Sequence, residues 1–257
     1  MPWPPAASAA PPPPFQVVGT MHHEKESFTQ GISSLLYHDG ALFESTGLYG
    51  KSEIRRVDPH TGTVISRTKL SRKLFGEGIV VVGDVLFMLT WREKRLLMFN
   101  AQSLELIHEL TFKSASGPGW GLAYDGEHLI CSDGSAVVVF WKVPDIHSRA
   151  TEEVRRFTVR TRGGVAQDQV NELEYVDGFI YANIWYKDKI IKIDPVTGTI
   201  VKHFDMSRLW PHKSRPRSAD CLNGIAYNET SRAFLLTGKM WPRYYTVKLN
   251  DAAATEL

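Results

Sequence analysis

The sequence predicts an all-β protein that folds as a single five-bladed β-propeller, with its ring closed by an N-terminal strand that pairs into the last blade. Three observations support this prediction. A short hairpin pattern recurs five times, a second hairpin pattern follows it at a similar interval, and an isolated strand near the N-terminus matches a strand that is missing near the C-terminus. Intervals of about 40 to 50 residues are typical of four-stranded propeller blades.

The first repeat is a strand, a turn containing Asp-Gly, Gly-Asp or Asn, and a second strand, which is the pattern of a β-hairpin. Its five copies begin at Gly31, Gly78, Gly121, Glu172 and Gly224. The intervals between these starts are 47, 43, 51 and 52 residues. We expect these hairpins to form the inner halves of five blades.

The second repeat predicts the outer halves of the blades. Two copies are nearly identical, IRRVDPHTGTV and IKIDPVTGTI, and two weaker copies lie between them. Their turn residues Asp58, Asn100, Asp145 and Asp194 are 42, 45 and 49 residues apart. The second repeat therefore keeps the same phase as the first.

The end of the chain indicates how the ring closes. The fifth inner hairpin is followed by only one strand, residues 244–249, whereas residues 15–21 form a strand pattern without a neighbour. Pairing these two strands would complete the fifth blade and cover its open edge. We therefore expect a propeller over residues 15–250, a disordered Pro/Ala-rich tail over 1–14 and a short tail over 251–257. Two small β-sandwiches would need a linker near the middle, which the sequence lacks.

Charge and cysteine content narrow the function classes. The chain has 30 Lys and Arg and 28 Asp and Glu, a net charge of +2, which argues against binding to nucleic acid or to an acidic membrane. Cys131 and Cys221 fit neither a disulfide framework nor a zinc site, and we expect both to be buried. No apolar run is long enough to span a membrane, and the first fourteen residues lack the features of a secretory signal. We expect a soluble protein, and the compartment stays open.

Hairpin geometry predicts where a functional site would lie. The start of the first strand and the end of the second lie at the same end of a hairpin, so these segments ring one mouth of the channel. They contain Phe28, Gln30, Phe75, Glu77, Trp91, Trp120, Asn171, Trp185, Lys239 and Trp241. Aromatic walls with few convergent polar groups are typical of small-ligand sites. Alternatively, the tryptophans could cap the blades, and Glu77 and Lys239 could be exposed.

At these same segments the sequence resembles the plant and bacterial type of glutaminyl-peptide cyclotransferase. Ten short phrases carry the resemblance, in the same order along residues 15–249. They are FTQG (28–31), FESTGLYG (43–50), FGEG (75–78), LTW (89–91), GWGL (119–122), SDG (132–134), NELEY (171–175), ANIW (182–185), LNGIAY (222–227) and TGKMWP (237–242). The family is a five-bladed propeller, in agreement with the repeats.

The resemblance implies an enzyme that converts the N-terminal glutamine of peptides and proteins to pyroglutamate and releases ammonia. Glu77 would bind the α-ammonium group, take its proton and pass one to the leaving amine. Lys239, with Asn171 or Gln30, would polarise the carboxamide oxygen. An aromatic wall of Phe28, Phe75, Trp91, Trp120 and Trp185 would exclude water, and Trp241 is expected with these residues and Gln30 among the substrate-binding residues. The expected partners are peptides with an N-terminal glutamine, and the enzyme is expected to be a monomer.

This scheme requires no metal and no cofactor. The only histidine cluster is His22-His23-Glu24, which lacks the spacing of a zinc protease motif. Adjacent side chains on a strand point to opposite faces. We therefore expect the cluster to be a solvated strand end.

Two other propeller functions remain as alternatives. A calcium-dependent lactonase or related hydrolase could place carboxylates and amides around the channel mouth. Its shell would consist of Glu77, Asn171, Asn223 and Asp133. Such a shell would need neither the aromatic wall nor Lys239. A non-catalytic scaffold propeller would instead carry its aromatic residues on exposed outer loops.

Overall fold

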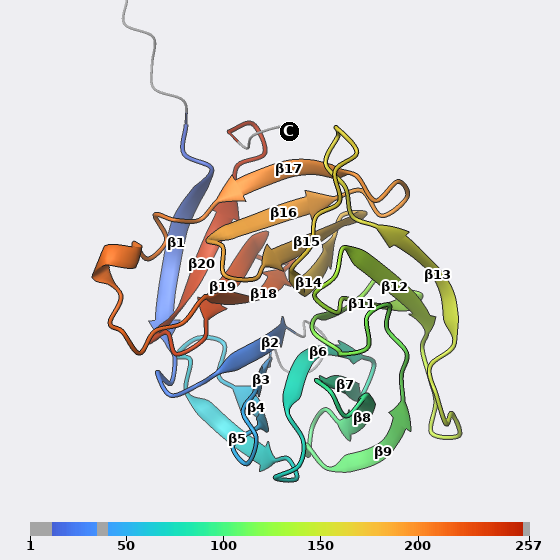
Figure 1. Ribbon diagram of the computed structural model, residues 1–257. Helices are drawn as coiled ribbons and strands as arrows, with labels where there is room; N and C mark the ends of the chain where they lie inside the picture. Colours follow the sequence, from blue (N-terminus) through green and yellow to red (C-terminus); the bar gives the residue numbers. More distant parts are fainter. Residues whose placement is uncertain (1–11, 35–40, 254–257) are drawn as a thin grey trace, which may run out of the picture.

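A computed structural model describes residues 12–34 and 41–253 and shows five antiparallel sheets of four strands around a common axis (Figure 1). The sheets are the five blades of a β-propeller, so the predicted fold class is confirmed. Among the described residues, no helix is long and apolar enough to cross a membrane.

The first three blades follow the chain in simple order. Blade 1 contains β2 (Thr29–Ser34), β3 (Leu42–Thr46), β4 (Glu53–Val57) and β5 (Val64–Lys69). Blade 2 contains β6 (Gly76–Val82), β7 (Val85–Thr90), β8 (Arg95–Asn100) and β9 (Leu106–Thr111). Blade 3 contains β10 (Leu122–Tyr124), β11 (His128–Cys131), β12 (Val137–Lys142) and β13 (Glu153–Thr158).

The last two blades include the closure of the ring. Blade 4 contains β14 (Val170–Val176), β15 (Phe179–Ile184), β16 (Lys189–Ile193) and β17 (Ile200–Asp205). A connection with one short 3₁₀ helix, η1 (His212–Ser214), leads to blade 5. Blade 5 contains β18 (Leu222–Asn228), β19 (Ala233–Gly238), β20 (Arg243–Leu249) and β1 (Phe15–His22).

The two ends of the chain meet in blade 5. Strand β1 pairs antiparallel with β20 from Phe15 opposite Leu249 to His22 opposite Arg243. The backbone N–H of Asn250 adds a hydrogen bond to the Pro14 carbonyl oxygen at 2.9 Å. The predicted completion of the last blade by the N-terminal strand is therefore confirmed.

The innermost strands β2, β6, β10, β14 and β18 contact one another around the axis. Glycine allows this close approach. A Cβ atom on Gly78 would lie 2.5 Å from the Trp120 carbonyl oxygen, and one on Gly121 would collide with the Asn171 carbonyl oxygen. The glycines that open most copies of the first repeat are thus explained by packing between neighbouring inner strands.

The repeated Asp-Pro turns also have a local cause. The Asp58 Oδ1 atom accepts hydrogen bonds from the N–H groups of His60 and Thr61 at 2.8 and 3.0 Å. Gly62 closes the turn with a φ of 77°, which favours glycine. Asp194 and Gly198 repeat this arrangement in blade 4.

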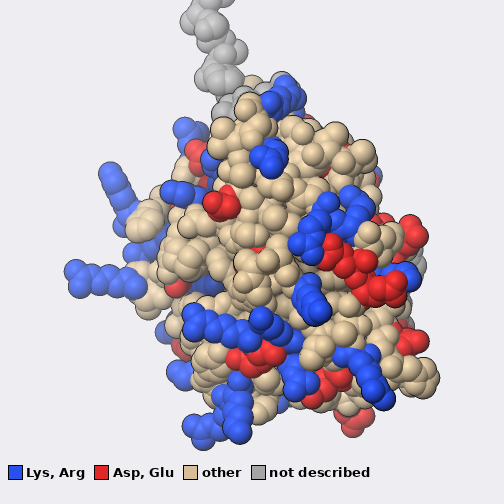
Figure 2. Space-filling view, turned by 45° about the vertical axis from the view of Figure 1, so that its right-hand side comes forward, with Lys and Arg blue, Asp and Glu red and all other residues tan. Residues whose placement is uncertain are grey.

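Apolar side chains fill the space between adjacent blades. In one such layer Val138 and Phe140 from blade 3 pack with Ile180 and Ile191 from blade 4. Both cysteines are buried, as expected, and both are free thiols. Positive and negative side chains are interspersed over the face shown in Figure 2.

A buried charged cluster joins blade 5 to blade 1 and extends the β1–β20 closure. The Glu44 carboxylate of β3 lies 2.7 Å from His23 Nε2 and 3.3 Å from Arg55 Nη1. The Tyr244 hydroxyl of β20 donates to the same carboxylate at 3.1 Å. His23 Nδ1 lies 2.5 Å from the Trp241 carbonyl oxygen. We call these four side chains, His23, Glu44, Arg55 and Tyr244, the closure cluster.

The closure cluster corrects the prediction for the histidine motif. His22 is exposed, as expected, but His23 is only 1% exposed. Its burial comes from contacts with Glu44 and with the Trp241 backbone, which are 21 and 218 residues away along the chain. A local sequence pattern carries no sign of contacts at such separations.

We predict that Glu44→Gln destabilises the fold in a pH-dependent manner. Burial by itself would raise the pKa of Glu44, but the charges and hydrogen bonds of His23 and Arg55 lower it from 4.5 to about 2. A carboxyl with a lowered pKa stabilises the folded state above its unfolded pKa, and this contribution is lost as the pH falls toward 2. Urea unfolding at pH 7 should show a loss of about 3 kcal/mol.

The loss should be clearly smaller at pH 3 than at pH 7. Glu109→Gln is the control because Glu109 forms only an exposed ion pair with Arg95, and it should change the unfolding free energy by less than about 1 kcal/mol. An equal loss for Glu44→Gln at both pH values would contradict the assignment of charge to this carboxylate.

Candidate active site

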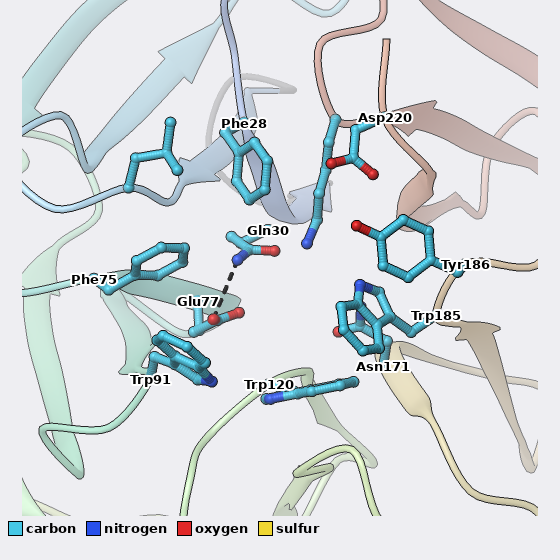
Figure 3. Close-up of a pocket in the computed structure, with 12 residues that line it drawn as sticks. Phe28, Gln30, Phe75, Glu77, Trp91, Trp120, Asn171, Trp185, Tyr186 and Asp220 are labelled. Carbon is cyan, nitrogen blue, oxygen red and sulfur yellow. Dashed lines mark hydrogen bonds between the residues drawn. The ribbon is translucent and has the colours of Figure 1, made fainter. Parts of the chain in front are cut away.

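A cavity of about 250 Å³ lies where the inner strands begin, and Figure 3 looks into it. Strand starts and strand ends share this rim, since Gly76 pairs with Thr90 and Leu222 with Gly238. The lining comes from all five blades. It consists of Phe28, Gln30, Leu48, Phe75, Glu77, Trp91, Trp120, Asn171, Trp185, Tyr186, Asp220 and Lys239. Nine of the ten residues singled out from the sequence are among them.

β-Bulges aim the polar side chains at this cavity. In four blades the inner strand shifts register near its first residues, and the bulges contain Gln30, Glu77, Asn171 and Asn223. A bulge bends a strand and redirects its side chains. The first three of these residues line the cavity, whereas Asn223 Nδ2 donates to the backbone oxygen of Gln30 at 3.1 Å and thereby fixes the neighbouring bulge.

Glu77 is the buried acid of the cavity. It is 4% exposed, and it accepts a hydrogen bond from Gln30 Nε2 at 3.1 Å (Figure 3). The Ser45 hydroxyl donates to the Glu77 backbone oxygen at 2.6 Å and fixes the strand there. Burial raises the pKa of Glu77 well above its usual value, although the charge of Lys239 opposes that rise. A carboxyl with a raised pKa is a stronger base when ionised than an ordinary glutamate.

Lys239 is the buried cation of the cavity. It is 5% exposed, and its Nζ lies 4.7 Å from the centre of the Phe28 ring. Its backbone is fixed on both sides, because its N–H donates to the Cys221 carbonyl and its carbonyl accepts from the Asp220 N–H. No hydrogen bond or ion pair to Nζ occurs within residues 12–34 and 41–253. The alternative interpretation of Lys239 as an exposed strand end is wrong.

Aromatic rings form two sides of the cavity. On one side Phe75 contacts both Phe28 and Trp91, with ring centroids 6.3 and 5.4 Å apart. On the other side Trp120 and Trp185 form an edge-on pair at 5.2 Å. Figure 3 shows these two groups on either side of Glu77 and Gln30. The arrangement is an apolar slot with its polar groups at the base.

Trp241 does not line the cavity, which contradicts its expected place among the substrate-binding residues. Trp91 and Trp185 directly follow β7 and β15, but the residue that directly follows β19 is Lys239. Trp241 comes two residues later, after Met240 with a φ of 62°, and it is fully buried. Its indole N–H donates to the Asp220 carbonyl oxygen at 2.9 Å and supports the rim from behind.

The sequence interpretation missed three lining residues. Leu48 and Tyr186 follow strand ends and have positive φ angles of 83° and 56°. Such backbone is uncommon for residues other than glycine and marks a tertiary constraint. Asp220 lies two residues before the start of β18. Tyr186 could have been found as the residue after the ANIW phrase.

The calcium shell of the lactonase alternative is not assembled. Asp133 does not line the cavity. Its carboxylate accepts from the Ser116 backbone N–H at 2.5 Å and from the Ser135 hydroxyl at 2.6 Å. Asn223 also lies outside the lining, since it holds the bulge of blade 1.

Comparisons with known proteins agree with this geometry. A sequence profile of the family described as glutamine cyclotransferase matches residues 4–249. The chain belongs to this family. A glutaminyl-peptide cyclotransferase from Arabidopsis thaliana is 36% identical to this chain over 241 residues. The match covers 93% of this chain and 72% of the relative.

A solved structure supports the same assignment. The crystal structure of the Myxococcus xanthus glutaminyl cyclase matches with a TM-score of 0.80 and 31% identity, covering 94% of this chain and 97% of that chain. The resemblance to glutaminyl-peptide cyclotransferases is therefore confirmed, and neither the lactonase nor the scaffold alternative is favoured.

We predict that the carboxyl of Glu77 titrates well above its ordinary pKa of 4.5. Carbon-13 NMR of protein labelled at the glutamate carboxyl carbon, with Glu77→Gln to assign the signal, measures this directly. Lys239→Met should move the midpoint further up, because it removes the positive charge that favours the ionised form. Glu93→Gln should move the midpoint down, because the negative charge of Glu93 contributes to the raised pKa of Glu77. An ordinary midpoint, or a downward shift in Lys239→Met, would contradict the described electrostatics.

Proposed function

We propose that this protein is a glutaminyl-peptide cyclotransferase that converts the N-terminal glutamine of peptides and proteins to pyroglutamate and releases ammonia. The observation that carries the proposal is that a buried acid, Glu77, and a buried cation, Lys239, line the same small aromatic cavity. Family membership and the names of the two relatives support it.

The reaction joins two ends of one residue. The α-nitrogen attacks the side-chain carboxamide carbon, a new C–N bond closes the ring, and the old C–N bond to the amide nitrogen breaks. Protons lost by the α-nitrogen are passed to the amide nitrogen, which leaves as ammonia. One group that can both accept and donate a proton near neutral pH satisfies this requirement.

Glu77 is the group we assign to proton transfer. Its carboxylate would bind the α-ammonium, remove a proton to make the amine nucleophilic, and return a proton to the leaving nitrogen. The raised pKa suits both halves of this task, since a strongly acidic carboxyl would be a poor base. Gln30 would hold the carboxylate in place through its 3.1 Å hydrogen bond.

Lys239 and Asn171 are assigned to the carboxamide oxygen. Negative charge develops on this oxygen as the tetrahedral intermediate forms, and a fixed cation with an amide donor lowers the energy of that state. Both side chains line the cavity and are buried. Burial strengthens their interaction with the developing charge because little water screens it.

We assign two tasks to the aromatic residues: they shape the cavity around the glutamine and exclude water from it. A glutamine side chain must fold back on its own amine before it can cyclise, and a narrow slot favours that conformation. The rings of Phe28, Phe75, Trp91, Trp120 and Trp185 would also keep water from the carboxamide carbon, where its attack would give glutamate instead.

The assignment of both proton transfer and charge stabilisation to side chains leaves no step that needs a metal or a cofactor. The reaction is an acyl transfer within the aminoacyl class, from the amide nitrogen to the α-nitrogen. We propose that the enzyme acts as a monomer and without metal, so ammonia release should persist in excess EDTA.

We predict that Glu77→Gln lowers kcat for a glutamine-initiated dipeptide by about 100-fold or more, as expected for the loss of a general acid and base. Ammonia release coupled to a spectrophotometric readout measures the rate. Glu109→Gln is the matched control, because Glu109 is exposed on β9, pairs with Arg95 and does not line the cavity. Near-normal turnover by Glu77→Gln would contradict the assignment.

For Lys239→Met we expect a fall in kcat of about 100-fold or more with a smaller change in KM, because its interaction is strongest in the transition state. The same ammonia assay measures both constants. An unchanged kcat would remove Lys239 from the reaction. A KM effect alone would limit it to substrate binding.

A further inference from the structure

A second cavity adjoins the active site across one shared rim. Its volume is about 420 Å³. Tyr186 and Asp220 line both cavities, whereas Asp188, Arg215 and Arg217 line the second one only. Anything that leaves the active site over this rim therefore enters the second cavity.

The shared rim, formed by Tyr186 and Asp220, could contact a peptide that extends from one cavity into the other. Tyr186 is 62% exposed and has a φ of 56°, an uncommon conformation for a residue with a side chain. Its ring packs on Trp185 at 4.6 Å. Figure 3 shows its hydroxyl on the side of Asp220, whose charge raises the pKa of Tyr186. The tyrosine ring can pack against a peptide backbone, and the neighbouring carboxylate can accept a hydrogen bond from one of its N–H groups.

The outer wall of the second cavity is fixed and basic. It belongs to the connection between β17 and β18, which Figure 1 draws in orange at the edge of the molecule. Residues 206–221 of this connection include four Lys or Arg residues and one acidic residue, Asp220. Arg215, only 6% exposed, binds Asp188 at 2.8 Å and lies 4.7 Å above the Trp241 ring, which anchors the connection to the body.

Of the two arginines that line the second cavity, Arg217 is the one available to bind a ligand. Asp188 is neutralised by Arg215, whereas no hydrogen bond or ion pair involves the Arg217 side chain within residues 12–34 and 41–253. It lines the second cavity and is exposed. An unpaired guanidinium above a fixed cavity wall favours a carboxylate partner.

We propose that the second cavity binds the residues that follow the N-terminal glutamine of the substrate, and that Arg217 favours an acidic side chain among them. This inference rests on the proposed function, because the glutamine must occupy the first cavity. The substrate class is then a glutamine-initiated peptide with Glu or Asp close behind the first residue. An extended chain advances about 3.3 Å per residue, so positions 2 to 4 are those that reach across the shared rim.

The test compares glutamine-initiated tetrapeptide amides that carry Glu or Lys at position 2, 3 or 4 and Ala elsewhere. For the wild-type protein, kcat/KM should be about fivefold higher for Glu than for Lys at one or more positions, and the difference should lie in KM. Arg217→Glu should abolish or invert this ratio. Lys213→Glu is the matched control, since it changes the same charge on the same connection outside the cavity, and it should preserve the ratio.

The possible results separate the two proposals. If the wild-type protein releases no ammonia from any peptide, including a glutamine-initiated dipeptide amide, the proposed function fails. If it turns over the dipeptide but shows equal kcat/KM for Glu and Lys at all three positions, the second cavity is not a peptide subsite. If Lys213→Glu changes the ratio as much as Arg217→Glu does, general surface charge explains the preference, and the role of Arg217 is overturned.

Discussion

Hydrogen bonding between β1 and β20 joins the two ends of the chain and makes one ring of five sheets. The active site depends on this closure, because its lining comes from every blade. The closure cluster adds a buried Glu44 carboxylate that blade 5 contacts through His23 and Tyr244. Breaking one partner of a buried ion pair costs more than the pair contributes when complete. The cluster therefore penalises any separation of blades 1 and 5.

A closed ring also explains the chemistry of its mouth. Inner strands that pack through glycine leave little room for water near the axis, and bulges at their first residues turn Gln30, Glu77 and Asn171 toward the same space. Removal of water raises the pKa of Glu77, and Lys239 nearby keeps the ionised form accessible. Burial and charge together set the pKa of the carboxyl to which we assign proton transfer.

The fold and most of the site could be predicted from the sequence because each blade repeats the same local pattern. Once the hairpins were in phase, positions such as Glu77 and Trp185 had to meet at one mouth. The errors involve contacts that no repeat encodes. Trp241 lies two residues beyond the position that Lys239 occupies, and His23 is buried by partners from other blades. Asp220 precedes its strand in a connection that the repeat leaves undefined.

We propose that the aromatic mouth of the closed ring directs the α-amine of an N-terminal glutamine to its own side-chain carboxamide and keeps water away. Mass spectrometry of a glutamine-initiated peptide after reaction in water enriched in oxygen-18 tests this most directly. We predict a product that is lighter than the substrate by one ammonia and carries no oxygen-18. A glutamate-initiated product labelled with oxygen-18 would show hydrolysis and would contradict the account.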